Sequence, residues 1–155
     1  MYRFILRKEF DMEKTPELLC YIYKNVKMGS DSIVTLMPKV KDASFREALT
    51  DQLSGYEEFA KKANEELTPL GIKPEEEPFI KKAMAKMGIA MNTMADASVG
   101  HMAEMLIQGS TMGITDMTKR VREFEGEGCP EKALKIGRDL ISFEQDNIEK
   151  MKTFL

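Results

Sequence analysis

The chain has no tryptophan, a single histidine and two cysteines among its 155 residues. The cysteines, Cys20 and Cys129, are far apart and form no C-x-x-C pattern, so the sequence predicts free thiols rather than a zinc knuckle or a disulfide framework. It also contains no Ser–His–Asp set, Walker loop or nucleotide-binding glycine fingerprint. The sequence therefore lacks the motifs of the commonest enzyme classes.

Long apolar runs and an excess of basic charge are missing as well. No stretch approaches the roughly 20 apolar residues of a membrane span, and the start lacks the apolar core of a signal peptide. The formal net charge is −3. The basic cluster 119–122 is followed by Glu123 and Glu125, which is typical of a solvated helix face. We therefore expect a cytoplasmic protein that binds neither membrane nor nucleic acid.

The residues that are present favour helices. The chain is 43% hydrophobic and 32% charged and contains 13 methionines, a mixture typical of an all-α domain. From Thr15, with Pro16 in the first turn, apolar residues recur three and four apart as far as Val40, and Pro38 is expected to bend the last turn. The pattern predicts one long amphipathic helix.

A second helix follows after a short break. Ser44 is the expected N-cap, with Glu47 as its capping-box partner, and the helix should end near Leu70–Gly71. A connection this short forces the two helices to run antiparallel as a hairpin. Half of a helical bundle is thus predicted from residues 15–71.

The helix-like sequence in the second half of the chain is too long to form one continuous helix in a compact bundle. We expect a shorter inserted helix at Phe79–Met94 and a break near Ala95–Ser98, with Ser98 capping the helix that runs from Val99 to about Glu125. The stretch that follows should be a loop containing Cys129, with Pro130 at the first position of the last helix.

The first residues fit poorly with the rest. Residues 1–14 are interpreted as an N-terminal extension, and residues 15–155 as a single domain. Arg7-Lys8-Glu9 can be encoded by a purine-rich run that resembles a ribosome-binding site just upstream of Met12. We hypothesise that Met12 rather than Met1 is the true start, which the intact mass of protein expressed from the native gene would test.

Two pairs of short stretches resemble each other. "KMGSDSI" at 27–33 matches "TMGITDM" at 111–117, and "QLSGYEE" at 52–58 matches "DLISFEQ" at 139–145. Tyr56-Glu57 thereby aligns with Phe143-Glu144. The order of the matches predicts two pseudo-repeated helical hairpins packed about an approximate twofold axis.

This organisation resembles the ferritin-like up-down four-helix bundle, here with an extra helix between the second and third main helices. The resemblance implies a Glu on the first and third helices and an E-x-x-H pair on the second and fourth, around a di-metal site. Both histidine positions differ here, being Ala60 and Asn147. The carboxylates that remain as metal candidates, with iron or manganese as the ion, are Asp31, Glu57, Asp116 and Glu144.

The single histidine is a further candidate. His101 shares a helix face with Glu104, so an ion pair or a hydrogen bond explains the pair without a function. A metal or acid–base role would need a nucleophile or a second imidazole nearby. We favour the structural interpretation and keep His101 as a possible addition to the carboxylate site.

Small residues and methionines each allow two interpretations. The small residues near mid-bundle either leave space for a ligand or metal, or they admit the large rings of Tyr56 and Phe143, which we favour. The list is Gly29, Ser30, Gly55, Gly109 and Gly113. The methionine stripe of the inserted helix is either an adaptable binding face or core, and core is favoured. It comprises Met84, Met87, Met91 and Met94.

These patterns predict a non-catalytic, bacterial-type ferritin-like bundle without a cofactor, acting through self-association or a protein partner. The alternative is a ferritin-like protein that binds iron or manganese on carboxylates alone.

Overall fold

The computed structural model describes residues 2–74, 81–82, 85–86, 88–90 and 94–155, with residues 2–13 described by their backbone alone. Within these residues every regular element is helical, so the predicted all-α class is confirmed. The elements are α1 (Tyr2–Leu36), η1 (Met37–Lys39), α2 (Ala43–Leu67), η2 (Thr68–Leu70), α4 (Val99–Gly126) and α5 (Glu131–Lys152). Among them, no helix is both long and apolar enough to cross a membrane.

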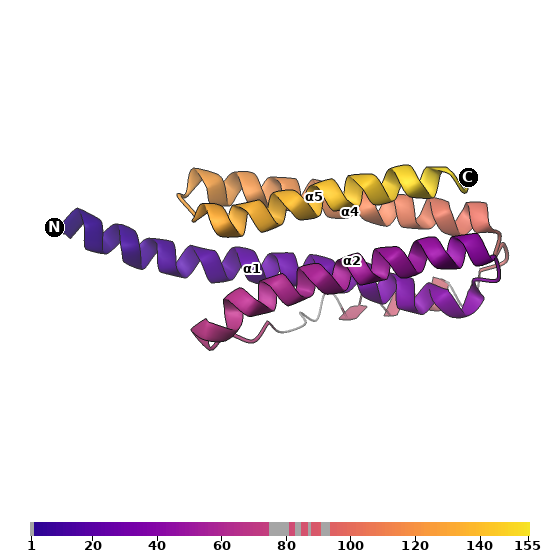
Figure 1. Cartoon of the computed structure of the whole chain (residues 1–155), viewed down its shortest axis with the longest axis horizontal. Helices are drawn as coiled ribbons and strands as arrows, with labels where there is room; N and C mark the ends of the chain where they lie inside the picture. Colours follow the sequence, from indigo (N-terminus) through magenta and orange to yellow (C-terminus); the bar gives the residue numbers. More distant parts are fainter. Residues whose placement is uncertain (1, 75–80, 83–84, 87, 91–93) are drawn as a thin grey trace.

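The four long helices pack side by side, and contacts between their ends fix their directions (Figure 1). The Phe45 ring at the start of α2 lies 5.1 Å from the Phe154 ring after α5. At the opposite end, Lys132 of α5 pairs with Glu66 of α2 at 2.7 Å. The helices α2 and α5 therefore run antiparallel.

A similar pair orients α1 against α4. Lys14 near the start of the packed part of α1 lies 2.9 Å from Glu127, just beyond the end of α4. Since α1 and α2 form one hairpin and α4 and α5 form the other, α4 runs in the same direction as α2. The start of α4 lies at the end of the bundle where α2 begins (Figure 1).

Helix starts follow capping chemistry, with one correction. Ser98 is the N-cap of α4, as predicted, and its hydroxyl accepts a hydrogen bond from the backbone N–H of His101 at 3.2 Å. The predicted Ser44 cap of α2 is wrong. Asp42 is the N-cap and accepts from the N–H of Phe45 at 2.8 Å, where a carboxylate also favours the positive end of the helix.

The first helix begins earlier than expected. It starts at Tyr2 and contains Pro16 in its interior, so the prediction of a start at Thr15 is wrong. Helical backbone continues through the predicted N-terminal extension, whose far end projects beyond the α4–α5 turn (Figure 1). The expected irregularity at Pro38 is confirmed, because it lies in the 3₁₀ turn η1. The hypothesis of a Met12 start stays a prediction.

Two glycines in left-handed backbone conformation end helical segments at the same end of the bundle. Gly71 has φ +69° and follows η2, and Gly128 has φ +80° and follows α4. Glycine adopts this conformation without the steric cost that a Cβ brings. The predicted stops at Leu70–Gly71 and in the loop with Cys129 are confirmed. Pro130 is the N-cap of α5 rather than its first helical residue.

The break predicted before α4 is also confirmed, since residues 94–98 are not helical. Of the predicted inserted helix, residues 81–82, 85–86 and 88–90 are helical. Met84, Met87 and Met91 lie outside the described residues. Met94 is partly buried and packs against the hydrophobic core, as the core interpretation expects.

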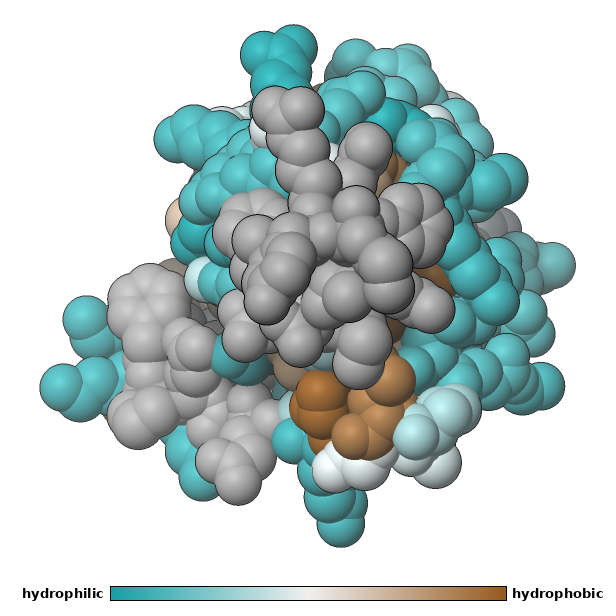
Figure 2. Space-filling view, turned by 90° about the vertical axis from the view of Figure 1, so that its left-hand side faces the viewer, coloured by the Kyte–Doolittle hydropathy of each residue, from teal (hydrophilic) through white to brown (hydrophobic). Residues whose placement is uncertain are grey.

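The core runs along the axis of the bundle and contains side chains from all four long helices. Its largest fully buried members include Phe45, Leu49, Met117 and Leu140. Figure 2 shows the end of the molecule at which α2 and α4 finish; the coloured surface there is mostly hydrophilic, with one small hydrophobic patch. Leu70, which is 48% exposed, is at this end.

Candidate functional site

A polar layer crosses the middle of the bundle inside the hydrophobic core. Tyr56 of α2 is 3% exposed and Glu144 of α5 is also 3% exposed. The Tyr56 hydroxyl donates a hydrogen bond of 2.7 Å to Oε1 of Glu144. Ser110 of α4 and Asn147 of α5 approach both groups. We call Tyr56, Ser110, Glu144 and Asn147 the polar layer.

The helix α1 contributes space to this layer. A Cβ on Gly29 would lie 2.6 Å from Cε1 and 2.8 Å from the hydroxyl oxygen of Tyr56, closer than real Cβ contacts. The glycine thus leaves the space that the phenol occupies where it bonds to Glu144. The prediction that the first repeated glycine admits an aromatic ring is confirmed.

The second repeated glycine has a different neighbour. A Cβ on Gly113 would lie 3.5 Å from the side-chain amide of Asn25, which is ordinary contact. The Asn25 amide donates to the Gly113 carbonyl at 3.3 Å, and this bond links α1 to α4. The prediction that Gly113 admits the Phe143 ring is wrong. That ring overlaps the place of a Cβ on Gly55 and lies edge-on to Tyr56, 5.1 Å between centroids.

The burial of the side chains explains why the sequence repeat paired the wrong residues of α2 and α5. Tyr56 and Glu144 are both buried near the middle of α2 and α5, whereas Glu57 is exposed and Phe143 is half-buried. The letters "YEE" and "FEQ" align Glu57 with Glu144, but the buried faces align Tyr56 with Glu144. A shift of one residue turns a helical side chain by about 100°, enough to move it from core to solvent.

The layer contains polar atoms without hydrogen-bond partners. Among the described residues, Oε2 of Glu144, Nδ2 of Asn147 and Nε2 of Gln52 are buried and unpaired. Gln52 lies one turn from Tyr56 on α2, and because α2 and α5 are antiparallel it faces the region of Asn147. Buried polar atoms without partners carry a free-energy cost of about 1–3 kcal/mol each.

Burial also shifts both acids of the layer. It raises the pKa of the Glu144 carboxyl, and the approach of Tyr56, Ser110 and Asn147 offsets part of that rise. The pKa of Tyr56 is raised well above 10.0, first by burial and then by the charge of Glu144. Folding therefore favours the neutral form of each group.

The structure does not bring the predicted metal ligands together. Asp31 lies on α1 and pairs with Lys27 at 2.8 Å, and Asp116 is 58% exposed and 4.0 Å from Arg120. His101 is half-buried at the start of α4. Of the four carboxylates only Glu144 is buried. The described part of the chain contains no group of three or more His, Cys, Asp or Glu side chains placed to hold a metal ion.

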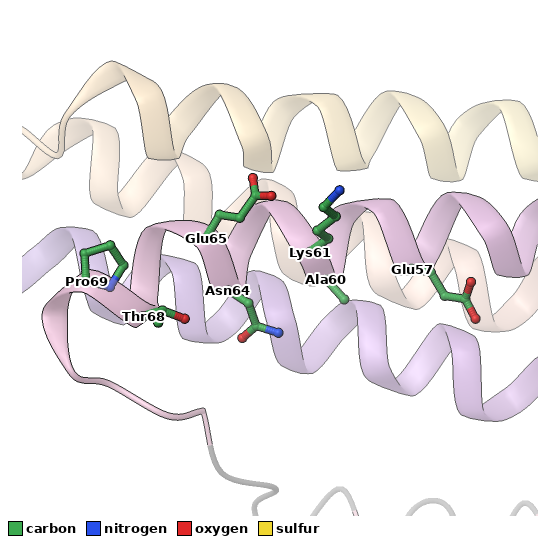
Figure 3. A pocket seen from close by; sticks show the side chains of 7 residues that line it. All are labelled: Glu57, Ala60, Lys61, Asn64, Glu65, Thr68 and Pro69. Atoms are coloured by element: carbon green, nitrogen blue, oxygen red, sulfur yellow. The ribbon is translucent and has the colours of Figure 1, made fainter.

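Glu57 lies in a shallow depression on the outside of the bundle. Its lining comes from the second half of α2 and from η2, as Figure 3 shows. Glu57 and Glu65 are eight residues apart, about 12 Å along the helix, with Lys61 between them. The two carboxylates are too far apart to bind one ion together. We therefore interpret the depression as ordinary helix surface rather than as a metal site.

Sequence reasoning did not identify the Tyr56–Glu144 hydrogen bond. The signal was present: Glu144 stands four residues after Leu140 and three before Asn147, and Met151 follows four later, all on one helical stripe. A carboxylate on an apolar stripe predicts a buried charge or a buried neutral acid. The similarity of the repeated letters drew attention to Glu57 instead.

Comparisons of the chain with protein-family models, with curated proteins and with solved structures found no match.

Proposed function

We propose that this chain is a non-catalytic bundle of ferritin-like architecture that acts through association with itself or with a protein partner. The helix directions support the architecture. Two antiparallel hairpins are joined by one long connection, and the second and third main helices are parallel. Bundles of the ferritin-like type have one such long crossover connection.

The filled centre carries the proposal. In ferritin-like di-metal proteins, the metal-ligating carboxylates converge at the middle of the bundle. Here the Tyr56 ring lies against Gly29 and the Phe143 ring against Gly55. The residues present do not fit a di-metal centre, because Glu57 is exposed and Asp31 and Asp116 are engaged with basic residues at the surface.

A protein without a reaction centre acts through its surface. The exposed large hydrophobic side chains include Met112 on α4, 72% exposed, and Val34 on α1, 56% exposed. Methionine is a soft, adaptable contact residue. We assign these two positions to association, because a partner that covers them removes apolar surface from water.

Sedimentation over a range of concentrations tests the association. Met112→Lys should weaken a self-associated species, or binding to a purified partner, by at least tenfold. Leu155→Lys is the matched control, since Leu155 is 70% exposed at the C-terminus, away from the middle of α4. A protein that stays monomeric at every concentration and has no partner contradicts the proposal.

The second candidate is a ferritin-like protein that binds iron or manganese on carboxylates. One observation favours it: Oε2 of Glu144 is buried and unpaired, and carboxylate oxygen is a ligand that these ions accept. Metal analysis of protein purified without chelator separates the candidates. A stoichiometric metal that is lost in the double variant Glu57→Ala plus Glu144→Ala supports the second candidate and contradicts the first.

A further inference from the structure

The polar layer is a hydrogen-bonded bridge between the two hairpins. Tyr56 belongs to the α1–α2 hairpin and Glu144 to the α4–α5 hairpin, and their bond of 2.7 Å is buried in the core. The ion pairs Lys132–Glu66 and Lys14–Glu127, which also join the hairpins, lie at one end of the bundle, and the Asn25 amide links α1 to the backbone of α4 at Gly113. Those ion pairs are partly exposed, whereas the bridge at Glu144 is shielded from water.

In the part of the chain that the structure describes, the side chains that approach Glu144 are uncharged. The helix α2 presents the Tyr56 phenol, α4 presents Ser110, and Asn147 stands on the same helix as Glu144. On α1, Gly29 lies against the Tyr56 ring that bonds Glu144 and adds no side chain of its own. In the described residues no lysine, arginine or histidine forms an ion pair with Glu144. An ionised Glu144 would thus be a buried charge without a counter-charge.

The surroundings of Glu144 also contain groups that can take up water. Oε2 of Glu144, Nδ2 of Asn147 and Nε2 of Gln52 form no hydrogen bond of ordinary geometry in the closed bundle, although Asn147 lies close enough to Glu144 to stabilise its carboxylate. Water that enters between α2 and α5 can form hydrogen bonds with Oε2 of Glu144 and with the neighbouring amide of Asn147. The gain from these bonds is largest when the carboxylate is charged, because the charged form loses the most hydration on burial.

We propose that Glu144 is a proton-controlled clamp between the hairpins: the neutral carboxyl keeps α2 and α5 closed, and its ionisation admits water and loosens them at mid-bundle. The sign follows from linkage. Burial raises the pKa of Glu144 above its ordinary value of 4.5. The clamp is therefore fully closed below pH 4.5 and weakens as the pH rises through the raised pKa. Tyr56 does not titrate in this range, because its pKa is well above 10.0.

Hydrogen exchange read by mass spectrometry tests the clamp on the whole chain. Wild type, Glu144→Gln and the matched control Glu57→Gln are compared at each pH from about 4 to about 8. Between the two pKa values the opening constant of peptides around Tyr56 and Glu144 should rise by up to tenfold per pH unit, relative to Glu144→Gln. Glu57→Gln should follow wild type, because Glu57 is exposed.

A second variant keeps the test decisive if Glu144→Gln does not fold. Tyr56→Phe retains the ring but removes the donor that stabilises the carboxylate, so the pKa of Glu144 rises further and loosening continues to a higher pH. The proposal is overturned if wild type and Glu144→Gln share one pH profile, or if Tyr56→Phe abolishes the pH dependence. It is equally overturned if peptides at the α1–α2 turn open with the same pH dependence as those at mid-bundle, since that outcome is global unfolding.

Discussion

The two hairpins share sequence stretches but pack differently. In the α1–α2 hairpin the close approach is between Gly29 and the Tyr56 ring. In the α4–α5 hairpin it is at Gly137, where a Cβ would lie 2.7 Å from Cγ2 of Val121. Gly113, the counterpart of Gly29 by sequence, faces Asn25 of the other hairpin. Similar residues thus serve different contacts, because the face of the helix decides which neighbour each one meets.

The largest expected difference between the hairpins is in their aromatic residues. Tyr56→Ala should lower the free energy of unfolding by about 3–5 kcal/mol, because the ring is buried and closely packed. Phe143→Ala should cost about 1–3 kcal/mol, because Phe143 is half-buried. Urea unfolding of both variants measures the difference. Equal losses of unfolding free energy would mean that Tyr56 and Phe143 are structurally equivalent, as the sequence repeat suggests.

A smaller effect distinguishes the two repeated glycines. Gly29→Ala should destabilise the protein by about 1–3 kcal/mol, because the new methyl group meets the Tyr56 ring. Gly113→Ala should be neutral or stabilising by up to about 1 kcal/mol, since its contact with Asn25 is ordinary and alanine favours the helix. Thermal unfolding of the two variants measures whether each substitution stabilises or destabilises the protein. Destabilisation of similar size at the two positions would contradict the structure.

The hydroxyl of Tyr56 should have a pH-dependent contribution. Tyr56→Phe should cost about 1.5–3 kcal/mol where Glu144 is ionised and about 0.5–1.5 kcal/mol where it is protonated, because hydrogen bonds to charged groups are stronger. The transition falls above pH 4.5, since burial raises the pKa of Glu144. Denaturant titrations at a series of pH values measure it, with Tyr21→Phe on α1 as the control. A cost that does not depend on pH would mean that Glu144 keeps one protonation state throughout.

The surface carboxylates should show the smallest effects. Asp31→Asn and Asp116→Asn each should change the free energy of unfolding by no more than about 0.5 kcal/mol, because both acids are in exposed or half-exposed pairs on single helices. Calorimetry of the two variants, with and without added manganese, checks this. If either substitution lowers the melting temperature by several degrees only when manganese is present, these carboxylates are metal ligands after all.

Composition, hydrophobic periodicity and the residues typical of caps and turns predicted the all-α class, the long α4 and α5 helices, the cap at Ser98 and the glycine stops. Those features depend on contacts within a few residues, which the sequence displays directly. The start of α1 and the cap at Asp42 differed because several residues could serve each end equally well.

The site was predicted less well than the fold. Glu144 was identified as a mid-bundle carboxylate. Its hydrogen-bond partner Tyr56 was missed, because the sequence repeat aligned the next residue of α2, Glu57, with Glu144. Asp31, Glu57 and Asp116 were chosen by residue type and sequence position, and none of them is buried as Glu144 is: Glu57 and Asp116 are exposed and Asp31 is half-buried. Convergence of four helices depends on their relative rotation, which a single sequence does not specify.

The central claim is that the middle of the bundle is filled by an aromatic ring that enters at a glycine. A double-mutant cycle of Gly29→Ala and Tyr56→Leu, followed by urea unfolding, tests it most directly. The account predicts that Gly29→Ala destabilises the protein when Tyr56 is present and stabilises it by up to about 1 kcal/mol beside leucine, with a coupling of about 1–3 kcal/mol. Additive effects of the two substitutions would contradict it, because they would place the ring away from Gly29.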